Sequence, residues 1–160
     1  MLMTKWNGIE SVHEYLVTTL SDVVPKPAWG ETSYFYNPGL QLKSGTYFAT
    51  IKERDSQNDN ASALNRPGVW RLNIGVSKKC YLSHFGPPPP RPGKGGVVEG
   101  PWDFTALDRI TPHPIYRWMS WIAVLSPTAG TWVKCQTLLA DAHSRAQITF
   151  ERRLKSLDRE

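Results

Sequence analysis

One alternating stretch, residues 66–76, constrains the fold of this chain more than any other segment. It opens with a Pro-Gly turn signal and then alternates apolar residues with polar or small ones. Successive side chains of a strand point to opposite faces of a sheet, so the pattern predicts a strand with one face in a core and the other open to a polar ligand. The core face would carry Trp70, Leu72, Ile74 and Val76, and the opposite face Arg71, Asn73 and Gly75.

Apolar spacing indicates a helix near each end of the chain. Asn7 and Glu10 form a capping-box arrangement around the start of an apolar stripe, and Pro25 is expected to end that helix. Thr131 is expected to cap a long final helix whose apolar stripe continues to Leu154. Each helix therefore has an apolar face to bury against another element.

The middle of the chain indicates strands around one short helix. Residues 32–36 and 47–52 suit an antiparallel pair, and 118–125 is apolar on both faces, which is typical of a central strand. Ser77 is expected to cap a short helix that ends at Gly86. The order helix, strands, short helix, strands, long helix predicts a two-layer α+β fold, with helices packed on an antiparallel sheet.

The length of the chain suits a single domain over residues 1–160, which can bury a core without disulfides or a structural metal. A loop rich in proline and glycine is expected at 87–100, where four consecutive prolines precede a glycine-rich run. This loop is either a mobile connection or a lid over a pocket. A phosphate-binding loop is disfavoured because no Gly-Lys-Ser/Thr ending follows the glycines.

Several classes of protein are disfavoured by the motifs. No apolar run approaches the length of a membrane span and the first nine residues hold no secretion signal, so a cytoplasmic protein without membrane contact is expected. The 4 His show no paired ligand spacing and the 2 Cys, expected as free thiols, lie far apart, so neither a metal nor another cofactor is expected. The glycine motifs of Ser-His-Asp hydrolases and of dinucleotide-binding folds are missing.

Three segments, in this order, resemble one family: Arg66–Val76, Asp103–Arg109 and Pro112–Tyr116. They are similar to the domain-of-unknown-function family 6194, and the resemblance runs from about the first helix to the last. The four prolines at 87–90 depart from the shorter loop usual in that family. The family has no established activity, so the resemblance implies a fold and not a reaction.

More distantly, the order of elements is similar to that of the MmcQ/YjbR-like fold. In that fold a helix precedes a three-stranded part, and a helix, further strands and a final helix follow. The segment Trp121–Ala142 carries this likeness, with an apolar strand, a proline turn and then a helix. Proteins of that fold have been called DNA-binding by analogy with double-wing modules, which makes nucleic acid a partner to consider.

His113 is the first candidate for chemistry. It lies between Pro112 and Pro114, so its backbone is extended and its turn is stiff. An imidazole titrates near neutral pH, and a pre-positioned one serves as a catalytic acid or base. The alternative is a turn histidine that bonds a backbone carbonyl.

Arg71 and Asn73 share the polar strand face and are predicted to bind substrate. A guanidinium holds a carboxylate or phosphate through two hydrogen bonds, and an amide two residues away can bind an adjacent oxygen. We expect Arg71 and His113 to converge on one cavity. The alternative for Arg71 is an ion pair across the sheet, with Asp55, Asp103 or Asp108.

The remaining candidates are helpers and walls of that cavity. Asp108 would orient the imidazole or take a proton, and Tyr34 would donate to developing negative charge. The alternatives are a local pair of Asp108 with Arg109 and an aromatic core position for Tyr34. The other residues expected to bind substrate are Glu31, Tyr36, Trp70 and Trp121.

Two functions of different classes fit these residues. The first is a small protein that binds an organic molecule in an aromatic-walled pocket, which the 7 Trp of the chain would help to build. Any catalysis would be cofactor-independent acid–base chemistry of the isomerase, cyclase or lyase type, within a biosynthetic pathway. The second is a nucleic-acid or protein interaction module, which the net charge of +5 and the basic final helix favour.

Overall fold

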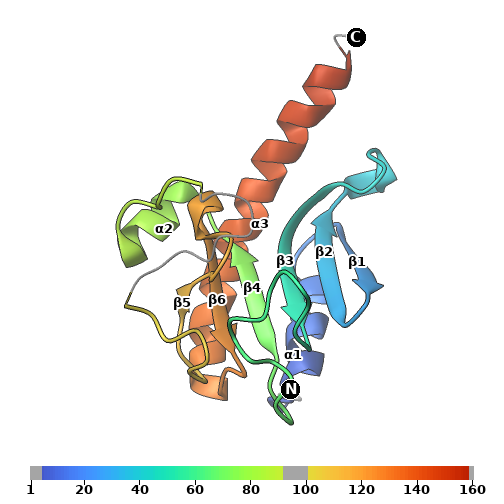
Figure 1. The fold of residues 1–160 in the computed structure, drawn as a ribbon. Coiled ribbons are helices and arrows are strands. Elements are labelled where there is room, and N and C mark those ends of the chain that lie inside the picture. Colours follow the sequence, from blue (N-terminus) through green and yellow to red (C-terminus); the bar gives the residue numbers. More distant parts are fainter. Residues whose placement is uncertain (1–4, 92–100, 159–160) are drawn as a thin grey trace.

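The computed structural model describes residues 5–91 and 101–158, which contain one six-stranded antiparallel sheet. Its strands are β1 (Val23–Ala28), β2 (Glu31–Tyr36), β3 (Thr46–Lys52), β4 (Arg71–Gly75), β5 (Thr111–Pro112) and β6 (Trp121–Leu125). They lie side by side in the order β1-β2-β3-β4-β6-β5 (Figure 1). The helical elements are α1 (Ile9–Glu14), the π-helical segment η1 (Tyr15–Thr19), α2 (Lys78–Phe85), α3 (Ala129–Asp158) and the 3-10 turns η2 (Pro38–Leu40) and η3 (Arg117–Met119).

The helices α1 and α3 pack on one face of the sheet, which gives two layers (Figure 1). The predicted α+β fold is therefore confirmed. The chain between β3 and β4 and the chain between β5 and β6 contribute side chains above the opposite face. That face is consequently free of the apolar helix packing that fills the core side.

Strand β4 has the two faces that the alternation in 66–76 predicts. Leu72 and Ile74 are buried in the core on the helix side, and burial of such a side chain contributes roughly 1.5–3 kcal/mol to stability. Arg71 and Asn73 alternate with them and point to the opposite face. Both polar side chains are nevertheless buried, so the second face is also covered.

The strand register aligns polar side chains into two rows across this second face. One row consists of Ser33, Thr50 and Asn73, and the other of Glu31, Lys52 and Arg71. Neighbours within a row lie directly opposite each other on adjacent strands, at Cβ distances of about 4.5–5.5 Å. Residues far apart in sequence therefore form one continuous polar surface.

The short helix predicted after β4 is confirmed. The Oγ of Ser77 accepts a hydrogen bond from the amide of Cys80 at 3.1 Å, which caps α2 at its start. Gly86, with φ of 77°, follows its last residue. The Asp141 carboxylate of α3 accepts hydrogen bonds from the amide and hydroxyl of Ser77, so the cap also ties α2 to α3.

The first helix is shorter than predicted, and a strand occupies its expected end. Helical structure finishes at Thr19, and Pro25 and Pro27 lie inside β1 instead of ending a helix. Because β1 is the outermost strand and pairs with β2 alone, a proline nitrogen that faces away from β2 leaves no ladder hydrogen bond unmade. The sequence pattern missed β1 because prolines are rare in strands as well as in helices.

Helix α3 continues beyond the sheet at its C-terminal end (Figure 1). Its earlier turns bury the predicted stripe, including Leu139, Ala142 and Ala146, against the core. Near its far end, Arg153 donates a hydrogen bond to the carbonyl of Gly45 at 2.6 Å, before β3 begins. Among the described residues, neither this helix nor any other combines the length and the apolar character that crossing a bilayer requires.

The loop expected at 87–100, either a mobile connection or a lid, falls mostly on residues 92–100, which lie outside the described residues. Of the described part, Arg91 places its guanidinium carbon 4.8 Å from the centre of the Trp118 ring. The lid hypothesis therefore stays a prediction.

Candidate functional site

A cavity of about 390 Å³ opens on the face of the sheet opposite α1 and α3. Its floor consists of side chains from β2, β3 and β4, and its rim includes Asp59, His113 and Tyr116. Polar groups line the floor, and the aromatic rings of Tyr47 and Trp121 form one wall. The predicted meeting of a strand face with His113 therefore occurs at a real concavity.

Asn73 at the floor of this cavity has a fixed orientation. Its Nδ2 donates to the Oγ1 of Thr50 at 2.8 Å, and its Oδ1 accepts from the Nε of Arg71 at 2.7 Å. Both ends of the amide are thus held, and only 1% of the residue is exposed. A polar group held in this way presents the same hydrogen-bonding atoms to any ligand.

Arg71 lies beneath the cavity and is fully buried. Its Nη1 donates to Asp59 Oδ1 at 3.0 Å and to Ser62 Oγ at 2.9 Å, and its Nη2 forms a salt bridge with Asp59 Oδ2. The alternative of an ion pair for Arg71 is confirmed, but its expected partners Asp55, Asp103 and Asp108 are wrong, because the loop after β3 brings Asp59 over the guanidinium instead. Arg71 therefore fixes that loop and Asn73 at once.

The predicted proximity of Arg71 and His113 is confirmed. The Nη2 of Arg71 lies 3.4 Å from the Nε2 of His113, and the imidazole is 2% exposed. Its Nδ1 accepts hydrogen bonds from the backbone amides of Ile115 at 3.1 Å and Tyr116 at 3.0 Å. The imidazole is thus bonded by backbone amides of its own turn. The alternative prediction, that His113 bonds a backbone carbonyl, is wrong.

These contacts define the protonation of His113. Two amides donating to Nδ1 require a lone pair there, so the proton of the neutral ring is on Nε2. Burial lowers the pKa of His113 well below its ordinary value, and the cations Arg71 and Lys52 lower the pKa further. His113 is accordingly a neutral hydrogen-bond donor through Nε2–H, and the geometry does not support a role as a general base.

Lys52 lines the same cavity, and 5% of the residue is exposed. Its Nζ donates to the Oγ of Ser56 at 3.1 Å. Within residues 5–91 and 101–158, Lys52 forms no salt bridge, although Glu31 is its cross-strand neighbour. Among these residues, the cavity thus contains a nearly buried ammonium group with no carboxylate at salt-bridge distance.

Gly75 allows the aromatic wall to lie over β4. A Cβ atom at this position would lie 2.7 Å from the indole ring of Trp121, which is too close for real contacts. Trp121 in turn packs against Tyr47, with ring centres 5.2 Å apart and planes at 31°. Glycine at position 75 therefore makes room for the indole of Trp121 beside the polar floor of the cavity.

The structure brings four of the nine predicted site residues into the lining of this cavity, and these are Glu31, Asn73, His113 and Trp121. Arg71 lies directly below them, in contact with Asn73 and His113.

Three aromatic residues lie on the helix side of the sheet. The Tyr34 hydroxyl bonds His13 Nδ1 at 2.7 Å, and burial raises the pKa of Tyr34 to about 12. Tyr36 packs edge-on against Phe150 and Trp70 belongs to the core. Tyr34 is an odd number of residues from Glu31, so the two side chains point to opposite faces and cannot share a wall.

Asp108 lies far from His113. Its amide bonds the carbonyl of Leu125 at 2.7 Å, whereas the amide of His113 bonds the carbonyl of Trp121 at 3.0 Å. These positions are the two ends of β6, roughly 13 Å apart at the rise of a strand. The Asp108 carboxylate instead accepts from the amide and hydroxyl of Thr128.

This Asp108 contact explains a second difference from the predictions. Helix α3 begins at Ala129, ahead of Thr131, which was expected to cap it. The hydrogen bonds from Thr128 and Thr131 lower the pKa of Asp108 and keep the carboxylate charged at the start of the helix. Asp108 is thus a structural anchor for α3.

Sequence reasoning missed the lining residues Lys52, Asp59, Tyr47 and Tyr116. The position of Lys52 could have been predicted from the sequence, because alternation along 47–52 places it on the same face as Thr50. The position of Asp59 could not have been predicted, because it lies in an irregular polar loop without a periodic pattern. Its position depends on the contact with Arg71.

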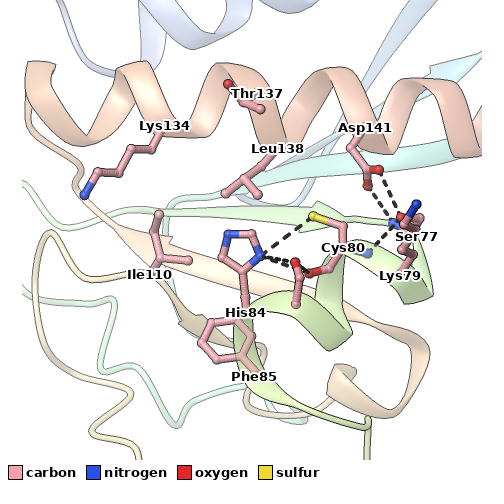
Figure 2. Close-up of a pocket in the computed structure, with 11 residues that line it drawn as sticks. Ser77, Lys79, Cys80, His84, Phe85, Ile110, Lys134, Thr137, Leu138 and Asp141 are labelled. Atoms are coloured by element: carbon pink, nitrogen blue, oxygen red, sulfur yellow. Dashed lines mark hydrogen bonds between the residues drawn. The ribbon is translucent and has the colours of Figure 1, made fainter.

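A second and larger cavity of about 840 Å³ lies between α2 and α3 (Figure 2). In it the Nδ1 of His84 lies 2.9 Å from the carbonyl oxygen of Cys80 and 3.9 Å from the thiol sulfur. Burial and the Asp141 carboxylate raise the pKa of Cys80 to about 11. The thiol is therefore protonated near neutral pH, and a Cys–His nucleophile is not supported here.

Within the described residues, no three His, Cys, Asp or Glu side chains form a group that could hold a metal ion.

Two cations of the basic final helix have partners within the fold. Arg145 donates to the carbonyl of Gly75 at 2.7 Å, and Arg153 donates to the carbonyl of Gly45. These two guanidinium groups therefore also have a structural role.

Together, the fold and the cavity define an α+β domain with a polar pocket on its open sheet face. A family model described as a family of unknown function (DUF6194) matches residues 3–155, and the chain belongs to that family. Neither the curated proteins nor the solved structures contain a match to this chain. The likeness to the MmcQ/YjbR-like fold stays a prediction.

Proposed function

We propose that this protein binds a small polar organic molecule in the cavity on the open sheet face. The observation that carries this proposal is the combination of oriented polar groups with an aromatic wall in one concavity of about 390 Å³. That volume lies within the range of about 300–1,000 Å³ usual for small-molecule sites. Asn73 and His113 would supply hydrogen bonds, and Tyr47 and Trp121 would pack against the carbon skeleton.

Pre-organisation further supports binding at this site. Asn73 is held by Thr50 and Arg71, and His113 by two backbone amides. Groups that are already ordered lose little conformational entropy when a ligand arrives, so more of the contact energy appears as affinity. In any catalytic version of this function, His113 would polarise a ligand oxygen through Nε2–H, and another group would act as base.

Fragment screening by two-dimensional amide NMR tests this proposal on the 18.1 kDa chain. We expect hits to shift the side-chain amide of Asn73 and the indole signal of Trp121. Ser33→Phe places a ring in the cavity floor and should abolish these hits. Ser83→Phe makes the same change in the α2–α3 cavity and should leave them intact.

The opposite pattern would contradict the proposal. Hits that survive Ser33→Phe and disappear in Ser83→Phe would place the binding site between α2 and α3. A screen without any hit that shifts Asn73 or Trp121 would remove the proposed function altogether.

A further inference from the structure

Lys52 forms no direct ion pair with a carboxylate among the described residues. The residue is 5% exposed, and within the described part of the chain its Nζ donates to one acceptor, the hydroxyl of Ser56. An ammonium group carries three N–H donors and is costly to bury without a partner of opposite charge. Glu31 lies opposite in register but forms no salt bridge with Lys52 in the described residues. A negatively charged ligand would supply the missing partner.

Two donors next to Lys52 have no acceptor among the residues that the structure describes. The Nε2 of His113 carries a proton, and it lies 3.4 Å from Nη2 of Arg71, which is also a donor. Arg71 has five N–H groups, and four of them donate to Asn73, Ser62 and both oxygens of Asp59. The fifth N–H therefore faces the imidazole, and an oxygen atom that accepts from Nε2–H would relieve this donor–donor contact.

The other charges of the cavity restrict the ligand to a single negative charge. Asp59 is neutralised by Arg71, and Glu31 adds a second carboxylate to the lining. A phosphate dianion would meet both carboxylates, with one unpaired cation, Lys52, to offset its charge. A carboxylate matches that one cation, and its two oxygens can reach Nζ and Nε2–H separately.

We propose, building on the function proposed above, that the ligand is an organic acid whose carboxylate binds the Nζ of Lys52 and the Nε2–H of His113. The rest of the molecule lies against Tyr47 and Trp121, which suits a ring or another flat group. Arg71 does not touch the ligand and acts as a positioning residue for Asn73 and Asp59.

Matched pairs of carboxylates and their primary amides test this inference, with benzoate and benzamide as the first pair. Amide NMR titrations of the wild-type chain give both affinities from the shifts of Asn73 and Trp121. We expect the acid to bind at least roughly tenfold more tightly than the amide, because a charged hydrogen bond is about twice as strong as a neutral one. This comparison needs no variant, so it does not depend on the folding of a mutant.

Lys52→Met then removes the charge while keeping the length of the side chain. We expect it to lower the affinity for the acid to that of the amide and to leave the amide unaffected. Lys79→Met, which removes an exposed lysine in the α2–α3 cavity, should change neither affinity.

Equal binding of acid and amide, or an acid affinity that Lys52→Met leaves unchanged, would overturn the organic-acid inference. So would a screen in which neutral fragments occupy the cavity and no acid does. In each of these cases the proposed small-molecule site still stands, because its own test is the loss of hits in Ser33→Phe.

Discussion

The two cavities differ in a way that size alone does not reveal. The α2–α3 cavity is about twice as large, at about 840 Å³ against 390 Å³, but its His84 and Lys79 are exposed side chains. In the sheet-face cavity, Asn73 and His113 are almost fully buried and bonded to the fold. Buried side chains that the fold already holds are better suited to select a ligand than exposed ones around a larger opening.

The largest expected difference between the two regions is in stability. Asp59→Asn would leave the buried guanidinium of Arg71 without its counter-charge, and we expect a loss of roughly 3–5 kcal/mol in the free energy of unfolding. Asp141→Asn weakens hydrogen bonds to Ser77 at a half-buried site and should cost about 1 kcal/mol. Urea denaturation of both variants measures the difference, and equal losses would show that the Arg71–Asp59 pair does not hold the sheet-face loop.

A second prediction concerns the aromatic wall. Gly75→Ala forces a Cβ atom against the indole of Trp121, so we expect a loss of about 1–3 kcal/mol and a displaced indole signal in the NMR spectrum. Gly130→Ala is the matched control, because a Cβ atom there meets nothing within 4 Å and alanine favours a helix. An unchanged Trp121 indole signal in Gly75→Ala would contradict the claim that Gly75 makes room for this ring.

The pH dependence of stability provides a third prediction. An unfolded histidine takes up a proton near pH 6.5, whereas the lowered pKa of folded His113 keeps its ring neutral at that pH. The contribution of His113 to the free energy of unfolding is therefore fully present above about pH 6.5. It is lost as the pH falls toward the pKa of the folded state, by up to about 1.4 kcal/mol per pH unit.

Urea unfolding between pH 7.5 and 5 measures that slope. We expect His113→Gln to reduce it, with His84→Gln as the control from the α2–α3 cavity. A slope that is the same in wild type and His113→Gln would mean that His113 is not held neutral.

The smallest expected effect is on thiol reactivity between α2 and α3. Because the pKa of Cys80 is about 11, alkylation by iodoacetamide should be slow at pH 7.5 and rise roughly tenfold per pH unit. Cys135, with a pKa of about 12 and full burial, should react more slowly still. Mass spectrometry of the alkylated peptides gives both rates, and fast labelling of Cys80 at pH 7.5 would contradict the raised pKa of its thiol.

Local patterns predicted much of the fold. Alternation in 66–76 placed Leu72 and Asn73 on the correct faces, and Ser77 and Gly86 marked the ends of α2. The strand β1 was missed because tertiary position decides whether Pro25 is tolerated. A proline is acceptable at the edge of a sheet, and one sequence does not show which strand is outermost.

The candidate site was predicted only where it depended on local geometry. His113 has a stiff turn and Asn73 a clear strand face, and both line the cavity. Asp59 reaches the site through a long loop whose path follows from the burial of Arg71. Tyr34 was misplaced because aromatic character was given more weight than its parity relative to Glu31.

The two outer strands of the sheet bear on how copies of this protein behave at high concentration. β1 contains two prolines, and β5 is two residues long and includes Pro112. Neither offers a continuous row of free amides onto which a strand from another molecule could add. Strand addition is therefore disfavoured at both edges of the sheet, even though its middle strands are rich in β-branched and aromatic residues.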